Sequence, residues 1–270
     1  MARATARPPR PAIMLTTDII KCKLCGCPVR IVRRADGAAD HYEAMRPEEI
    51  ADMPPPPTPQ HLADFLREER KGKRVVAIVG SAWTSRGWAP YGEEEVWCFN
   101  EMHGQPGVGD ATRWFQLHPK WVFTKDHRLN HWPWLQEEHR FPVYMQREYD
   151  NVPRSTRYPL REIQDNLLRN IWKGDTQLRK IFGSSMAYGV ALALHEGVFD
   201  RIELFGIELV LEGEWAYQRE SMAFWLGKAS GMGVEIWMPE ECELFRMPLY
   251  AYEEVRRGDG SIDIAPGEGK

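Results

Sequence analysis

The sequence contains no long apolar run and no excess of positive charge. A membrane-spanning helix needs about 20 consecutive apolar residues, and no run in this chain approaches that length. Lys and Arg together number 35 and Asp and Glu 39, which gives a formal net charge of −4 at pH 7. The chain as a whole therefore offers no electrostatic attraction for nucleic acid or anionic lipid. We expect neither a membrane partner nor a duplex-coating role.

The sequence also lacks a secretory signal and an even set of cysteines. Its Arg- and Pro-rich start has no apolar segment of the kind that directs secretion. The chain has five cysteines, an odd number that argues against a disulfide framework: Cys22, Cys25 and Cys27 cluster, and Cys98 and Cys242 lie far from them. We therefore expect a cytoplasmic protein, in a reducing compartment.

Changes in composition divide the chain into four parts. Residues 1–53 are expected to hold a disordered start and a small Cys-containing module. The proline run within residues 54–60 predicts a semi-rigid linker, because proline supports neither helix interiors nor strand ladders. Residues 61–250 form the main domain, and residues 251–270 are expected to be a flexible tail.

Short apolar runs alternate with helical patterns through the main domain. Buried strands are expected over residues 74–79, 96–99, 113–117, 142–145, 201–205 and 234–238. Helices are expected over residues 59–71, 160–172, 184–196 and 217–230. This alternation predicts an α/β fold, a Rossmann-like doubly wound and mostly parallel sheet. Ligands of such sheets bind beyond the carboxyl ends of the strands, where the strand order reverses.

A glycine and several hydroxyl residues directly follow the first expected strand. Gly80 allows a tight turn, and Ser81, Thr84 and Ser85 offer hydroxyl groups and backbone amides to an anion. The segment matches neither the Gly-x-Gly-x-x-Gly dinucleotide pattern nor a P-loop. It predicts phosphate binding, with an ordinary strand-to-helix turn as the alternative.

A second such turn precedes the clearest helix. Gly183, Ser184 and Ser185 stand where the unpaired amides and the positive end of the helix dipole would face a ligand. Serine is also the usual N-cap residue, so capping alone explains one of the two hydroxyls. The second serine favours contact with a phosphate or ribose.

Polar residues follow or end several of the expected strands. Asn100 and Gln116 suit hydrogen bonds to a base or ribose, and Glu208 and His118 are candidate catalytic groups for proton transfer. A lone histidine is also often structural.

Two residues at the start of the expected helix 217–230 are candidate phosphate ligands. Tyr217 and Arg219 carry a phenol and a guanidinium, groups that bind phosphate well. Either one could instead be a solvated neighbour of the helix start.

The N-terminal module carries a candidate structural zinc site. Cys-x-x-Cys-Gly-Cys followed by a histidine provides four ligands for a tetrahedral ion: Cys22, Cys25, Cys27 and His41. The alternative is three reduced thiols in a small surface module. Beside the cysteines, Arg30, Arg33 and Arg34 offer contacts to nucleic acid, which we expect only at this module, or to a protein partner; the alternative is an ordinary basic face of a β-hairpin.

Three segments resemble a known family. They resemble segments of Rossmann-like bacterial sialyltransferases. The segments are the serine-rich helix start and Gly-Ile-Glu strand end over residues 183–208, the Val-Gly-Ser turn over 76–82 and the Cys-Phe-Asn strand end over 97–100. They are also similar to 6-hydroxymethylpterin diphosphokinase-like proteins and to proteins encoded by bacteriophages. The resemblance spans residues 74–239, and a phage origin would place the protein in the host cytoplasm.

The resemblance implies a nucleotide site. It assigns Gly80, Ser81 and Asn100 to the nucleotide, Ser184 and Ser185 to phosphate or ribose, and Tyr217 to the leaving phosphate. Glu208 stands where the family has aspartate, and no residue matches the catalytic histidine of the sialyltransferases. The expected function is a transferase whose nucleotide-activated donor carries a sugar or a diphosphate. The alternative is a non-catalytic module that binds a nucleotide or protein and recruits a partner through the zinc knuckle.

Overall fold

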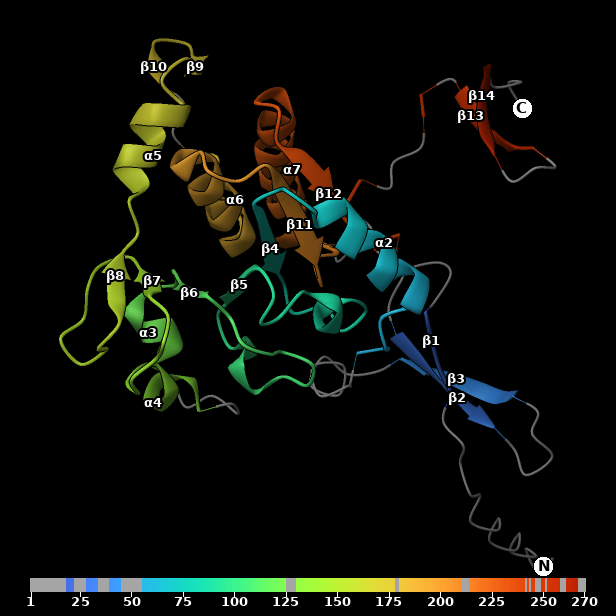
Figure 1. The fold of residues 1–270 in the computed structure, drawn as a ribbon, viewed down its shortest axis with the longest axis horizontal. Helices are drawn as coiled ribbons and strands as arrows, with labels where there is room; N and C mark the ends of the chain where they lie inside the picture. Colours follow the sequence, from blue (N-terminus) through green and yellow to red (C-terminus); the bar gives the residue numbers. More distant parts are fainter. Residues whose placement is uncertain are drawn as a thin grey trace, which may run out of the picture. The chain divides into compact units, whose positions relative to one another are not determined.

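The computed structural model (Figure 1) describes residues 18–21, 28–33, 39–44, 55–124, 130–177, 180–209, 214–240, 242, 244–245, 249–250, 252–257 and 261–266. The chain forms two compact units, Met1–Pro54 and Pro55–Lys270. In the first unit, three antiparallel strands follow the order β1-β2-β3: β1 (Asp18–Lys21), β2 (Pro28–Arg33) and β3 (Ala39–Ala44). Within the described part of the chain, no helix is both long and apolar enough to cross a membrane.

A seven-stranded sheet forms the centre of the second unit. Its order is β12-β11-β4-β5-β6-β7-β8, and every neighbouring pair is parallel. The strands are β4 (Val75–Val79), β5 (Glu95–Phe99), β6 (Arg113–Gln116), β7 (Val143–Met145), β8 (Ser155–Arg157), β11 (Arg201–Phe205) and β12 (Glu235–Trp237). The chain leaves β4 toward one edge and returns to its other side at β11, so the strand order reverses between them. The predicted Rossmann-like α/β fold is confirmed.

Helices cover both faces of this sheet. One face packs on α5 (Leu160–Leu167), α6 (Ser185–Glu196) and α7 (Glu214–Gly231). The other packs on α2 (Gln60–Arg70), α3 (Lys120–Phe123), α4 (His131–Leu135) and the 3₁₀ turns η1 (Arg86–Trp88) and η2 (Met102–Gly104).

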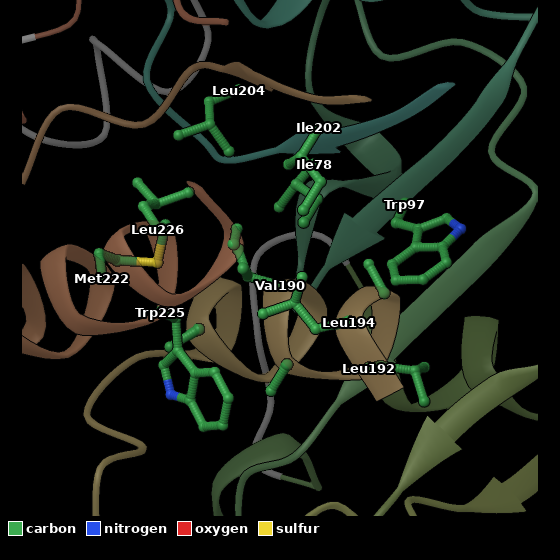
Figure 2. Packing of buried hydrophobic residues seen from close by; sticks show 14 of the residues in the cluster. Ile78, Trp97, Val190, Leu192, Leu194, Ile202, Leu204, Met222, Trp225 and Leu226 are labelled. Atoms are coloured by element: carbon green, nitrogen blue, oxygen red, sulfur yellow. The ribbon is translucent and has the colours of Figure 1, made fainter. Parts of the chain in front are cut away.

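Alternation along the strands creates the two cores. Side chains on successive strand residues point to opposite faces. Ile78 and Ile202 lie toward Val190 of α6 (Figure 2), in a buried cluster that also contains Trp225 and Leu226 of α7. The neighbouring Val79 instead joins the core beneath α2 and η1. Because β4 is buried on both faces, its sequence is a continuous apolar run rather than an alternating one.

Both ends of α6 follow from local sequence. Ser184 has an extended backbone, and its hydroxyl accepts a hydrogen bond from the Ala187 N–H at 3.2 Å. Gly197 ends the helix in the left-handed conformation, at φ 63°, which glycine adopts without steric cost. The predicted helix 184–196 is thus present within one residue.

The structure differs from the sequence expectations in three segments. Helix α5 ends at Leu167 rather than at residue 172, because a short hairpin follows, with β9 (Trp172–Lys173) and β10 (Thr176–Gln177) around Gly174 at φ 60°. Strand β8 is too short and polar to predict from its sequence. Residues 251–270, expected as a tail, contain a second antiparallel hairpin of β13 (Tyr252–Arg256) and β14 (Ile262–Pro266).

The buried thiol of Cys98 should be chemically inert in the folded protein. Burial in β5 raises its pKa to about 12, so at about pH 8 only about one molecule in ten thousand carries the reactive thiolate. We expect iodoacetamide to leave Cys98 unmodified in the native protein and to alkylate it after unfolding in urea, as read by peptide mass spectrometry. Alkylation of native Cys98 at the rate of a free thiol would contradict this burial.

Candidate functional site

A cavity of about 540 Å³ opens at the carboxyl edge of the sheet, a volume in the range of small-ligand sites. It lies beyond the ends of β4, β5 and β6 and at the beginning of α6. Sixteen residues line it: Gly80, Ser81, Phe99, Asn100, Glu101, Met102, Gln105, Leu117, His118, Phe182, Gly183, Ser184, Ser185, Met186, Tyr188 and Gln218. Both glycine–serine turns identified in the sequence therefore face the same space.

The first turn is held by the end of β11, the strand beside β4 at the point where the strand order reverses. The Gly80 N–H donates to the Phe205 carbonyl at 2.8 Å, and the Ala82 N–H donates to the Gly206 carbonyl at 2.9 Å. The buried guanidinium of Arg86 donates to the Ser81 carbonyl at 2.8 Å. These bonds fix the backbone of the turn against the sheet.

The second turn is fixed by α7. The Gly183 N–H donates to the Ser221 hydroxyl at 2.9 Å, and the Trp225 indole N–H donates to the Ile181 carbonyl at 2.5 Å. The Ser184 hydroxyl caps α6, as described above. Ser185 follows it at the first position of the helix, where backbone N–H groups have no partner within the helix. The cavity thus receives one serine hydroxyl that capping does not use.

Asn100 lines the cavity together with the two turns and holds an unusual backbone conformation. Its φ is 53°, in the left-handed region that few residues other than glycine and asparagine adopt. The conformation is held by its N–H, which donates to the Phe115 carbonyl at 2.8 Å, and by its carbonyl, which accepts from the Trp114 indole at 2.9 Å. Backbone strain of this kind often occurs at ligand sites.

The side chain of Asn100 is incompletely satisfied. Its Nδ2 donates to the Ser185 hydroxyl at 3.5 Å. Its Oδ1 is buried and has no hydrogen-bond partner among the described residues. A buried amide oxygen without a donor costs about 1–3 kcal/mol, so this atom marks a place where a ligand donor would be stabilising.

His118 lies at the edge of the cavity beyond β6. Its Nδ1 is 2.9 Å from Oε1 of Gln116, and its backbone N–H donates to the same oxygen at 3.1 Å. Gln116 is buried and does not line the cavity, so its amide orients His118 rather than offering itself to a base or ribose.

Four other predicted site residues are not among those that line the cavity. The buried Ser85 hydroxyl accepts from the Gly206 N–H at 2.9 Å, and the Glu208 carboxylate accepts from the Thr84 hydroxyl, so both support the first turn. Arg219 donates to the Leu244 carbonyl at 3.1 Å. Tyr217 is half-exposed and does not line the cavity, whereas the next residue, Gln218, does.

Several lining residues were not predicted from the sequence. Tyr188 lies one turn after Ser185 on α6, a spacing of three that puts both on the same side of the helix. Burial raises the pKa of Tyr188, so its phenol stays protonated at neutral pH. Gln105 follows η2 in a loop and has no local signal; Arg86 holds its side-chain oxygen at 3.3 Å.

The candidate zinc ligands remain a prediction. Cys22, Cys25 and Cys27 lie outside the described residues, and His41 lies in β3, where the backbone alone is described. Among the residues that the structure does describe, no group of three or more His, Cys, Asp or Glu could hold a metal ion.

Comparisons with known proteins give one distant structural likeness. No family model matches the chain, and a search of curated proteins gave no match. One solved structure with a similar chain path is the sialyltransferase CstII from Campylobacter jejuni in complex with a substrate analogue, cytidine-5′-monophosphate. The two chains share 14% sequence identity, and the match covers 62% of this chain and 79% of the sialyltransferase chain, with a TM-score of 0.37. The function must therefore be inferred from the cavity itself.

Proposed function

We propose that the cavity binds the nucleotide portion of an activated donor and that the protein is a transferase. The observation that carries this proposal is the buried Oδ1 of Asn100, which has no hydrogen-bond partner among the described residues. It belongs to a residue with a left-handed backbone that lines the same cavity as the two glycine–serine turns. A ribose hydroxyl or a base amino group would supply the missing donor. The start of α6, with the Ser185 hydroxyl beside it, would bind the phosphate.

The side chains that line the cavity favour a ligand of low charge. Among the described lining residues, the ionisable groups are Glu101, His118 and Tyr188, and the polar remainder consists of amides, hydroxyls and backbone groups. Apolar side chains such as Phe99 and Phe182 offer surfaces for a base or sugar. This composition suits one phosphate better than two, so we propose a nucleoside monophosphate donor in preference to a diphosphate.

His118 is our candidate for the catalytic base. An imidazole at the edge of the cavity can take the proton of an acceptor hydroxyl as the hydroxyl oxygen bonds to the transferred group. The bond between that group and the donor phosphate breaks at the same time, and the phosphate leaves with the electron pair. Glu208, which bonds Thr84 behind the first turn, is assigned to support of that turn.

Calorimetry with nucleotides tests the proposal. We expect cytidine, uridine and adenosine monophosphates to include at least one ligand, bound more tightly than its diphosphate. Asn100→Gly should weaken that binding about tenfold or more, because the ligand loses its acceptor. Glycine tolerates φ 53°, so the fold should be retained.

Asn130→Gly is the matched control. Asn130 also has a left-handed backbone, at φ 52°, but it is exposed before α4 and does not line the cavity. We expect it to leave the dissociation constant unchanged. If no nucleotide or nucleotide sugar gives a binding heat with the wild-type protein, the proposal is wrong.

A further inference from the structure

A line of polar side chains runs from the cavity into the protein interior. His118 contacts Gln116 at the end of β6, and Nε2 of Gln116 is 2.8 Å from Nε2 of His131 at the beginning of α4. His131 Nδ1 is in turn 3.3 Å from Nδ1 of His103. Gln116 is 1% exposed and His131 0%, so the two middle members are shielded from water.

The backbone fixes which way the Gln116 amide faces. A backbone N–H can only donate, so the group 3.1 Å from the His118 N–H must be the amide oxygen. The same oxygen lies 2.9 Å from His118 Nδ1. Since an amide oxygen can only accept, His118 Nδ1 must carry a proton. When the ring is neutral, its lone pair is therefore on Nε2.

The same orientation of the Gln116 amide determines the tautomer at the buried end of the line. The Gln116 amide nitrogen can only donate, so His131 accepts through Nε2 and its proton is on Nδ1. That proton is directed to Nδ1 of His103. Protonation of His131 at Nε2 would place two N–H groups against each other in a site without solvent exposure. The orientation of the Gln116 amide, fixed by the His118 N–H, thus also sets the tautomer of His131.

We propose that Gln116 is a positioning residue that selects the tautomer of His118. Neutral histidine side chains in water prefer the proton on Nε2, so the bond to Gln116 imposes the less common form, with the proton on Nδ1. The Nε2 lone pair then accepts a hydrogen bond, or a proton, from a hydroxyl of the bound substrate. This role rests on the proposed function, in which His118 is the base.

Nitrogen NMR of the full-length, ligand-free protein tests the proposal directly. Long-range ¹H–¹⁵N spectra, recorded where the ring is neutral, separate a protonated ring nitrogen from one with a lone pair. We expect His118 to show a protonated Nδ1 and a lone pair on Nε2 in the wild type. Gln116→Glu keeps an acceptor oxygen and should keep this tautomer, whereas Gln116→Met should shift the population toward the Nε2–H form.

Gln146→Met is the matched control. The exposed Gln146 donates to the Leu117 carbonyl at 2.8 Å, so it contacts the same loop without contacting the His118 ring. It should leave the His118 tautomer unchanged. A wild-type His118 with its proton on Nε2 overturns the proposal even if Gln116→Met fails to fold, as does an unchanged tautomer in a folded Gln116→Met protein.

The role of Gln116 and the proposed function can be rejected independently of each other. Nucleotide binding is measured by calorimetry, and the tautomer is measured without ligand. Binding of a nucleotide to a protein whose His118 has the Nε2–H form rejects the role of Gln116 alone. The expected tautomer in a protein that binds no nucleotide rejects the proposed function alone.

Discussion

Replacing Glu203 by glutamine is expected to lower the free energy of unfolding by about 3–5 kcal/mol. The Glu203 side chain is fully buried in β11 and accepts from Arg70 Nη2 at 2.6 Å and from Arg201 Nε at 2.9 Å. Glutamine keeps the size of the side chain but removes its negative charge. The largely buried guanidinium of Arg70 then loses the carboxylate that pairs with it, and Arg201 keeps only the more exposed Glu235 and Glu69. Because Arg70 belongs to α2, the substitution should also loosen that helix on the sheet.

Urea unfolding with Glu235→Gln as control separates burial from charge. Glu235 also accepts from Arg201, at 3.1 Å, but its side chain is 48% exposed. Water compensates for an exposed charge, so the loss should stay within about 1 kcal/mol. Equal losses for the two variants would show that the environment of Glu203 is not as dry as its burial indicates.

Gly80→Ala is expected to destabilise the fold by about 1–3 kcal/mol and to abolish nucleotide binding. A Cβ at this position would collide with the Gly206 carbonyl oxygen and lie 2.9 Å from Cγ1 of Ile207. The obstacle is backbone, which cannot rotate away as a flexible side chain would. Relief of the collision has to separate the ends of β4 and β11, and this movement displaces Ser81 from the cavity.

Gly227→Ala, on the exposed side of α7, provides the matched control. No atom lies within 4 Å of a Cβ built at this position. Alanine favours helix and restricts the unfolded chain, so we expect the free energy of unfolding to rise by about 0.5–1 kcal/mol. The melting temperature should fall for Gly80→Ala and rise slightly for Gly227→Ala, and calorimetry should show nucleotide binding only for Gly227→Ala. A Gly80→Ala protein as stable as wild type would reject the close contact of the strand ends.

The fold could largely be predicted from the sequence because its signals are local. Residues 75–79 are buried on both faces and form an uninterrupted apolar run, whereas the equally buried residues 201–205 combine three apolar side chains with the paired Arg201 and Glu203. Helix α6 carries both its cap and its stop, Ser184 and Gly197. Strand β8, with the half-buried and exposed residues 155–157, has no such signal; its place at the sheet edge depends on pairing with β7.

The candidate site could be predicted only in part. Strand ends of a parallel sheet meet at one edge, so the sequence alone already indicates that Gly80, Asn100 and His118 lie near Ser185. Sequence order does not tell which way a side chain points once it reaches that edge. Two adjacent residues, Tyr217 and Gln218, differ in this respect, because the helix turns about 100° between them.

The sequence by itself determined the parallel sheet, the two glycine–serine turns and the cap of α6, since each depends on residues close together in the chain. Only the tertiary structure decided that Ser85 and Glu208 brace the first turn while Gln105 and Gln218 line the cavity. The lack of a partner for Oδ1 of Asn100 among the described residues also depends on residues far apart in sequence, because it can be recognised only once the surrounding side chains are in place.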